Sequence, residues 1–88
     1  MVEAAVTSGE APEQEGGLQK RSVTLAGHRT SIALEKEFWE ELDRLAHDQG
    51  IALSRLIETC DSARPPGAPL ASSLRLLVLK ILKAAAAR

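Results

Sequence analysis

The 88-residue sequence has very little cysteine and histidine, and it lacks the short motifs that many enzymes share. Cys60 is the single cysteine, so an internal disulfide is excluded, and we expect a small buried hydrophobe there rather than a reactive thiol. His28, His47 and Cys60 show neither a CxxC nor an HxxxH spacing. There is no glycine-rich phosphate loop and no nucleophile elbow. The sequence therefore predicts no enzyme, no catalytic residue, no cofactor and no metal.

Basic residues are missing from the start of the chain. Residues 1–19 contain four Glu and no Lys or Arg, whereas residues 20–88 hold all eleven cations against eight acids, which gives +3. Low hydrophobicity and charge of one sign are typical of a disordered acidic tail, which we expect over 1–19. The folded part is mildly basic, which is compatible with nucleic-acid binding.

Long hydrophobic runs are also missing. The apolar run at 74–82 is interrupted by two cations and is shorter than the ~18–20 residues that span a bilayer. No targeting segment is evident. We therefore expect a cytoplasmic protein with no membrane contact. A foldable part of about seventy residues buries only a modest core, so dimerisation is the expected source of additional stability.

A short strand is predicted at about 28–34, leading directly into a helix. Its side chains point alternately to two faces. The outward face is small, has hydrogen-bonding capacity and carries one cation, which suits a ribbon in a DNA major groove. Because that groove admits a two-stranded ribbon, the second strand is expected from a partner chain. The inward face consists of Thr30, Ile32 and Leu34, and the outward face of Arg29, Ser31 and Ala33.

Ser22–Leu25 is a second strand-like piece whose phase differs from that of 28–34. Its apolar side chains fall at odd positions, whereas those of 30–34 fall at even positions. Since side chains alternate strictly, one continuous strand cannot bury both sets on one face. Two alternatives follow: Gly27 marks a bulge or break, or residues 20–27 form a flexible arm. No internal repeat is evident from this pattern.

Helical periodicity predicts three helices, at about 35–49, 52–62 and 72–84, with residues 84–88 frayed. Gly50 is the expected left-handed C-cap of the first helix, and the proline-rich segment 64–69 ends the second. The third helix carries more apolar surface than a small monomer can hide, which indicates a subunit interface. Its wide apolar face is Leu70, Leu74, Leu77, Val78, Ile81 and Leu82, with Leu76 and Leu79 outside it.

The order of strand, amphipathic helix, glycine and second amphipathic helix resembles the ribbon-helix-helix DNA-binding proteins. The segments Lys20–Thr24, Gly27–Ser31 and Glu37–Trp39 look like a short branch of that superfamily found in bacteria. In that branch a third helix opens with a Leu-x-Ser-Ser-x-Leu-Arg-like segment, which Leu70–Arg75 fits. The resemblance covers about residues 20–83, which we take as the domain.

The resemblance implies a mainly α fold with one short strand per chain. Two chains would form an intertwined homodimer whose strands pair into an antiparallel ribbon, with the third helix added. The implied base contacts are Arg29, Ser31 and Ala33, and the phosphate contacts are Lys20, Arg21, His28, Ala52, Leu53 and Ser54. The implied dimer core is Ile32, Leu34, Phe38, Trp39, Leu42, Leu45, Leu53, Leu56 and Ile57.

Two residues depart from the family pattern. Ala52 stands where a small hydroxyl residue is usual, so the helix keeps its backbone N–H groups for a phosphate but loses a side-chain donor. Ala33 can touch a thymine methyl but cannot hydrogen-bond a base. Both departures predict modest affinity or relaxed specificity.

The leading prediction is a homodimeric transcriptional regulator that binds double-stranded DNA. The alternative keeps the fold but makes it a protein-interaction module, an antitoxin-like or adaptor dimer that uses the third helix as its partner surface. The surplus leucines of that helix and the weak net charge favour this alternative.

Overall fold

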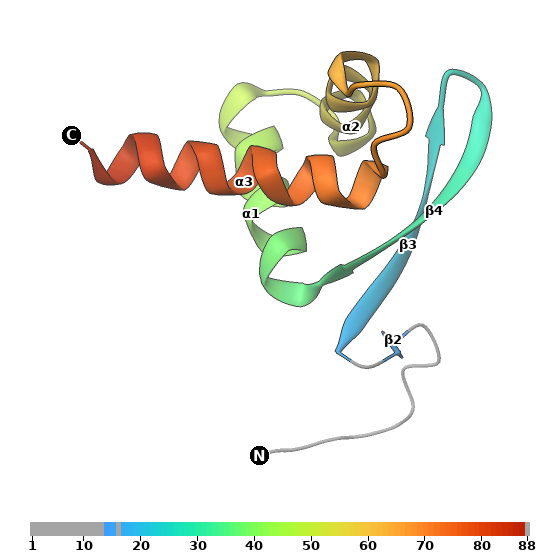
Figure 1. Cartoon of the computed structure of the whole chain (residues 1–88), viewed down its shortest axis with the longest axis horizontal. Helices are drawn as coiled ribbons and strands as arrows, with labels where there is room; N and C mark the ends of the chain where they lie inside the picture. Colours follow the sequence, from blue (N-terminus) through green and yellow to red (C-terminus); the bar gives the residue numbers. More distant parts are fainter. Residues whose placement is uncertain (1–13, 16, 88) are drawn as a thin grey trace.

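The structure is a computed structural model that describes residues 14, 15 and 17–87, and Figure 1 shows the arrangement of its elements. A small antiparallel sheet stands beside three helices. The strands are β2 (Gln14–Glu15), β3 (Leu18–Leu25) and β4 (His28–Glu35), and the helices are α1 (Lys36–Gln49), α2 (Leu53–Ala63) and α3 (Leu70–Ala86). Helix α3 is longer at both ends than the predicted range 72–84, and residues 84–86, expected to fray, are helical.

The ribbon is formed within one chain, which corrects the expectation of one strand per chain. Strands β3 and β4 pair antiparallel along their whole length, with Ser22 opposite Ser31 near the middle. Ala26 and Gly27 form the connecting turn, and both have positive φ, 50° and 85°. Two successive positive φ angles define the type I′ turn, whose twist matches that of a hairpin. The break predicted at Gly27 is therefore the hairpin turn, and residues 20–27 form neither a bulged continuation of β4 nor a flexible arm.

The folded part begins earlier than the predicted boundary at residue 20. Leu18 and Gln19 are the first residues of β3, and Gln14–Glu15 pairs with them as β2. These residues therefore belong to the sheet rather than to the tail. Residues 1–13 and 16, which the predicted tail also includes, lie outside the described residues.

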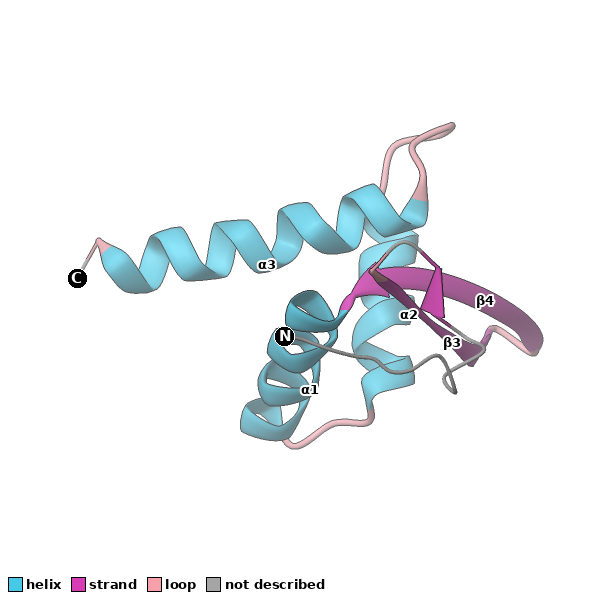
Figure 2. Ribbon diagram, turned by 90° about the horizontal axis from the view of Figure 1, so that it is seen from below, coloured by secondary structure: helices cyan, strands magenta, loops and turns pink. Residues whose placement is uncertain are grey.

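All three helices lie on one side of the hairpin (Figure 2). Leu25, Ile32 and Leu34, which face the helices, are buried, because alternate residues of β3 and β4 meet the apolar stripes of the helices. The buried core is Leu25, Ile32, Leu34, Trp39, Leu42, Ala46, Leu56, Ile57, Leu74 and Val78.

Helix α3 contributes to the core of the single chain. Leu74 and Val78 of α3 are buried in the same core as the residues of the hairpin, α1 and α2. Six of the nine residues predicted for a dimer core are therefore buried within one chain, and Phe38, Leu45 and Leu53 are partly buried against them. Leu82, predicted on the inner face of α3, is instead 42% exposed.

One end of the hairpin is fastened to α1 by polar contacts. The Trp39 indole N–H donates to the carbonyl oxygen of Gln19 over 2.8 Å. The Arg21 guanidinium donates to both carboxylate oxygens of Asp43, each over 3.0 Å, and its carbon lies 4.6 Å from the centroid of the Trp39 ring. Two parallel bonds and a cation–π contact together fix the orientation of this side chain.

The tip of the hairpin and the end of β4 are fastened to α2 and α3. The Ala26 N–H donates to a carboxylate oxygen of Glu58 over 2.9 Å. The Arg75 guanidinium donates to both carboxylate oxygens of Glu35, over 3.0 and 3.3 Å, and lies 5.8 Å from the Phe38 ring centroid. The hydrogen bond from Arg75 is the main cause that holds the pKa of Glu35 below its ordinary value. The hairpin is therefore held at both ends.

The helix ends differ in how they are capped. Gly50 has φ of 69° and caps α1 in the left-handed conformation, as predicted. The N-cap positions are Glu35, Ala52 and Pro69, and the side chain forms no capping hydrogen bond at any of them. Among the described residues, no helix has both the length and the apolar character that crossing a bilayer requires.

Candidate nucleic-acid interface

The face of the hairpin that points away from the helices gathers small polar side chains and two cations. In an antiparallel pair, residues opposite each other share a face. The register therefore places Lys20 with Ala33, Ser22 with Ser31, and Thr24 with Arg29 on this face. Five of the six are exposed and Ala33 is partly buried. The outward face is defined here as Lys20, Ser22, Thr24, Arg29, Ser31 and Ala33.

The charges of the outward face are both positive and stand at diagonal corners. Lys20 and Thr24 are four residues apart on β3, and Arg29 lies opposite Thr24. Four residues of strand span about 14 Å, so the two cations are separated by about that distance along the ribbon. Between them lie three hydroxyl groups and one methyl group. This surface can donate and accept hydrogen bonds and can contact an apolar methyl, which are the interactions that base edges offer in the major groove.

The four predicted DNA contacts that carry a cation or an imidazole are divided between the two faces of the hairpin. Lys20 and Arg29 are on the outward face, whereas Arg21 is on the helix side, opposite Ile32, with its guanidinium bonded to Asp43. His28 is opposite Leu25, so it also falls on the helix side, at the exposed tip of the hairpin. The structure thus brings Lys20 together with the predicted base contacts Arg29, Ser31 and Ala33, and separates Arg21 from them.

The predicted phosphate site at the start of α2 contains backbone groups without a side-chain cap. Ala52 is the N-cap, and its carbonyl oxygen accepts from the amides of Arg55 and Leu56. The amides of Leu53 and Ser54 belong to the first turn, where backbone N–H groups have no partner within the helix. Helix α2 itself packs against β3 through Leu56 and Ile57 of the shared core.

Ser22 and Thr24 belong to the outward face but were not among the predicted contacts. The signal that reveals them is the change of phase between 22–25 and 28–34. With a two-residue turn, each even-numbered residue of β3 pairs with an odd-numbered residue of β4, and the reverse, as Ser22 and Ser31 illustrate. The odd apolar positions of one strand and the even positions of the other are therefore what a two-residue hairpin requires.

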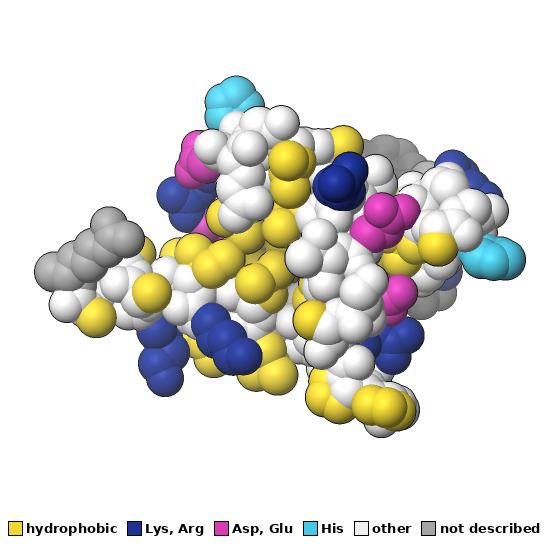
Figure 3. Space-filling model, turned by 90° about the horizontal axis from the view of Figure 1, so that it is seen from above, with side chains coloured by type: hydrophobic (Ala, Val, Ile, Leu, Met, Phe, Trp, Pro, Cys, Tyr) yellow, Lys and Arg dark blue, Asp and Glu magenta, His cyan; other side chains and the backbone are white. Residues whose placement is uncertain are grey.

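A second notable surface is an apolar trough between the end of α1, α2 and α3. It is a hollow of about 520 Å³, and Figure 3 shows hydrophobic side chains gathered over this region. Leu76, Leu79 and Leu82 of α3 are 54%, 50% and 42% exposed, and the first of them lines the trough. We define the apolar lining of the trough as Leu45, Leu56, Cys60, Ala63, Leu76, Leu77 and Ile81.

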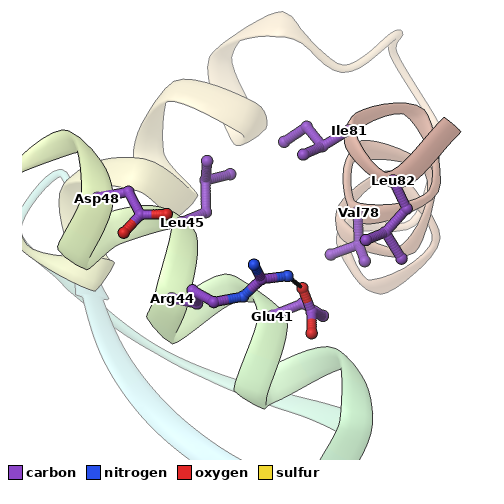
Figure 4. Close-up of a pocket in the computed structure, with 7 residues that line it drawn as sticks. All are labelled: Glu41, Arg44, Leu45, Asp48, Val78, Ile81 and Leu82. Atoms are coloured by element: carbon purple, nitrogen blue, oxygen red, sulfur yellow. Dashed lines mark hydrogen bonds and ion pairs between the residues drawn. The ribbon is translucent and has the colours of Figure 1, made fainter. Parts of the chain in front are cut away.

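A smaller hollow lies on the other side of Leu45 and Ile81, between α1 and α3. Figure 4 shows Val78, Ile81 and Leu82 pointing from α3 toward α1. The α1 wall carries Asp48 together with the ion pair between Glu41 and Arg44. The two hollows therefore flank one apolar ridge, and the smaller of them has acidic groups on its α1 side.

The described residues offer little for other chemistry. Among residues 14, 15 and 17–87, no group of three or more His, Cys, Asp or Glu side chains is placed to hold a metal ion. Burial, as the largest cause, raises the pKa of the Cys60 thiol above its ordinary value, so the thiol is held in its less reactive neutral form.

A two-stranded ribbon with a polar outward face, backed by amphipathic helices, is an architecture that β-ribbon DNA-binding proteins use. A family model described as the ribbon-helix-helix domain matches residues 18–82, and the chain therefore belongs to the ribbon-helix-helix family. This confirms the resemblance seen in the sequence. The family is a non-enzymatic fold whose members are generally DNA-binding transcription regulators or antitoxins and typically dimerise. No curated protein and no solved structure matches the chain.

Proposed function

We propose that this protein is a transcriptional regulator that binds double-stranded DNA by inserting the outward face of its hairpin into the major groove. One observation carries the proposal: a two-stranded ribbon exposes a cationic, hydroxyl-rich face while all three helices lie behind it. A major groove about 12 Å wide admits a ribbon of two strands. Membership of the ribbon-helix-helix family supports the same conclusion.

The base contacts are assigned by chemistry. Arg29 donates to the two acceptors on the edge of a guanine, Ser31 donates to or accepts from either kind of base, and Ala33 contacts a thymine methyl. Ser22 and Thr24 share the outward face and add two more hydroxyl groups. A surface of hydroxyl groups and one methyl group distinguishes the bases less sharply than side chains that form two hydrogen bonds to one base. We therefore expect moderate sequence specificity.

Phosphate contacts flank the base contacts in this proposal. The amides of Leu53 and Ser54 at the start of α2 bind one phosphate, with Ala52 contributing backbone only. His28 contacts a phosphate from the exposed tip of the hairpin. Arg21 instead stays with Asp43 and acts on the orientation of the hairpin. These contacts give affinity for any sequence and fix the register of the ribbon.

We further propose that two copies associate through the apolar trough and α3. Helix α3 is apolar nearly all round, which is typical of a helix covered on more than one side. It carries Arg75, Lys80 and Lys83 but no acid, whereas Glu41 and Asp48 of α1 line the smaller hollow together with Arg44. One chain therefore offers both a basic, apolar helix and a hollow edged by carboxylates. A two-fold interface requires a surface that is complementary to itself in this way.

Association through the trough is tested with Cys60, the single cysteine, which lines it. Alkylation is followed at mildly alkaline pH, because the pKa of the thiol is raised. Slower alkylation at higher protein concentration, together with a dimer in sedimentation and a monomer for Leu76→Lys, is the expected result. If the isolated chain is monomeric and Cys60 is protected from alkylation only when a different protein co-purifies with it, the antitoxin-like or adaptor role is favoured instead.

The DNA-binding proposal is tested by incubating the full chain with a random duplex-DNA library at moderate salt and sequencing what is retained. We expect an enriched inverted repeat with short half-sites, since operator symmetry mirrors the symmetry of the protein. Lys36→Ala, which removes an exposed cation of α1 outside the outward face and both hollows, serves as the control and should return the same sequence. The proposal fails if no sequence is enriched while the protein is folded.

A further inference from the structure

The two hollows beside α3 differ in charge. The smaller hollow has Glu41 and Asp48 on its α1 side, beside Arg44 (Figure 4). The lining of the trough includes Arg64 and Lys80 and, among the residues that the structure describes, no carboxylate. Charged groups across an interface are arranged so that opposite signs meet. The two hollows therefore suit occupants of opposite charge, and the trough suits an acidic one.

Lys80 is the cation of the trough that remains for a partner. Arg64 is engaged within its own chain, because its guanidinium donates to a carboxylate oxygen of Asp61 and to the carbonyl oxygen of Ala68, each over 2.6 Å. Lys80 is exposed and forms no ion pair with another described residue. An occupant of the trough therefore needs apolar side chains for the lining and a carboxylate within reach of Lys80.

Helix α3 of a second copy fits the smaller hollow better than the trough. It carries three cations, Arg75, Lys80 and Lys83, and no acid. In the trough these cations would approach Lys80 of the first copy, and like charges brought together weaken binding. In the smaller hollow they would meet Glu41 and Asp48. A different part of the second copy is therefore expected in the trough.

Residues 1–13, named here the N-terminal segment, have the composition that the trough requires. They contain Glu3, Glu10 and Glu13 and neither Lys nor Arg, and five of the first six residues are apolar. The apolar five are Met1, Val2, Ala4, Ala5 and Val6. The exposed face of α1 is also rich in acids, but all its exposed side chains are polar and cannot cover an apolar lining. Apolar and acidic groups stand together only in the first of these two candidates.

The N-terminal segment is long enough to leave its own chain. It continues from β2, where Gln14 pairs with Gln19 at the start of β3. Thirteen residues span about 43 Å when fully extended, at about 3.3 Å per residue. The longest dimension of the described structure is 37 Å. The segment of one copy can therefore reach the trough of a second copy whose α3 lies in the smaller hollow.

We propose that the N-terminal segment of each copy docks in the trough of the other, with its apolar residues against the lining and Glu3 beside Lys80. This inference rests on the proposed association of two copies, because it names the part of the second copy that fills the trough. The exchange occurs twice in a dimer, as two-fold symmetry requires. Docking covers Leu76, which is 54% exposed, and Cys60, which lines the trough.

The direct test is a disulfide between the segment and the trough. Val6→Cys places a second thiol in the segment, and Cys60 is the natural thiol of the trough. Mild oxidation at a concentration at which the chain is dimeric should join the introduced thiol of one copy to Cys60 of the other. The product is a covalent dimer on a non-reducing gel. Thr24→Cys, which places the second thiol on the outward face instead, is the matched control and should form no bond with Cys60.

The second test removes the segment. A variant that lacks residues 2–12 keeps β2, and it should associate about 10-fold more weakly, because ordering a segment on docking offsets part of what its contacts contribute. At the same protein concentration its Cys60 should be alkylated faster than in the full chain. A synthetic peptide of residues 1–13 should restore the protection of Cys60. The same peptide with Val2→Ser and Val6→Ser is the control and should not.

Charge reversal tests the contact between Glu3 and Lys80. Glu3→Lys and Lys80→Glu should each weaken association about 3- to 10-fold, and the double variant should recover most of the loss, since it restores a pair of opposite sign. Sedimentation measures all three. Lys36→Glu changes an exposed cation outside both hollows, so combining it with Glu3→Lys should restore nothing.

Either of two results would overturn the inference while leaving the association of two copies intact. A disulfide within one chain would place the segment in its own trough. Protection of Cys60 that survives the deletion of residues 2–12 would mean that another part of the second copy fills the trough. A chain that stays monomeric, with Cys60 equally reactive at every concentration, removes the proposed association and this inference together. Library selection judges DNA binding separately.

Discussion

The helix-side and outward faces of the β3–β4 hairpin are made from the same two strands, yet they contribute to the protein in different ways. On the helix side, Leu25, Ile32 and Leu34 are nearly or fully buried, and Arg21 is bonded to Asp43. The outward face is exposed at five of its six positions. Packing therefore constrains which residues can occupy the helix-side face. It does not constrain which residues occupy the outward face.

This difference teaches that stability and recognition are separable along one strand. Adjacent residues alternate between the two faces, so a substitution at one position affects the core and the next position affects only the surface. Lys20 beside Arg21, and Ala33 beside Leu34, are such neighbours. The following substitutions exploit this alternation, in order of decreasing expected effect.

Leu34→Ala should have the largest effect. Leu34 is fully buried, and removing a buried leucine side chain costs about 2–5 kcal/mol, which is a large fraction of the stability of a small domain. Urea unfolding followed by the fluorescence of Trp39, the single tryptophan, measures the loss. Ala33→Ser, on the outward face, should stay within about 0.5 kcal/mol of the original protein. Equal losses for both would contradict the division into two faces.

Arg29→Ala should leave the melting temperature unchanged and cost about 1–3 kcal/mol of specific binding, with relaxed preference at one base position. The reason is that Arg29 is exposed and lies among the outward hydroxyl groups. Fluorescence anisotropy with the selected duplex and with random duplex measures both affinities. An equal loss on the two duplexes would assign Arg29 to a phosphate instead.

Arg21→Ala should lower the stability and leave DNA binding nearly unchanged, which is the reverse of the effect expected for Arg29→Ala. It removes the bonds to Asp43 and the contact with the Trp39 ring, at a cost of about 1 kcal/mol in stability, since both partners of the ion pair are partly exposed. Binding of the folded protein to DNA should change little. Asp43→Ala should give a similar loss, and the double variant should lose less than the sum. A loss of DNA affinity with unchanged stability would instead show that Arg21 contacts a phosphate.

Ala26→Asn should stabilise the hairpin by about 0.5–1 kcal/mol. Ala26 has φ of 50°, a left-handed conformation that asparagine tolerates better than alanine. The N–H that bonds to Glu58 is retained in the variant. Thermal unfolding measures the gain, and Gly27→Ala, at the other turn position, should be destabilising. A destabilising Ala26→Asn would show that the turn is held by its surroundings rather than by its own preference.

Acidification should have the smallest effect on stability, through the ion pair of Glu35 at the end of β4 with Arg75. Arg75 lowers the pKa of Glu35 below its ordinary value of 4.5. The carboxylate therefore stabilises the fold above that value, and this contribution is lost as the pH falls through the lowered pKa. Comparing urea midpoints at about pH 6 and about pH 3 should show a smaller change for Glu35→Gln than for the original protein. An identical change would mean that the Arg75 contact does not stabilise the folded state.

Local sequence patterns predicted the helices well. The spacing of Leu42 and Ala46, and the position of Gly50, gave α1 to within one residue of its start. Helical periodicity and left-handed caps depend on residues within a few positions of each other, so a single sequence is enough to reveal them. The resemblance to the ribbon-helix-helix family was also recognisable before the structure.

The hairpin was missed although its signal was present. The change of phase across Ala26 and Gly27 indicates a bulge, a break or a flexible arm equally well, and only the pairing of β3 with β4 identifies it as a two-residue turn. Ser22 and Thr24 are likewise recognisable as outward residues only when Ser22 is placed opposite Ser31. Strand pairing joins residues that no local pattern links.

The sequence by itself determined which segments are helical, which residues alternate along the strands and that the chain belongs to this family. The tertiary structure decided that the second strand comes from the same chain, that α3 completes the core through Leu74 and Val78, and that Arg21 faces α1 while Lys20 faces outward. The physical reason is that periodicity is local, whereas pairing and packing depend on which surfaces meet. The outward face, which brings Lys20 and Arg29 onto one surface, exists only once the two strands have paired.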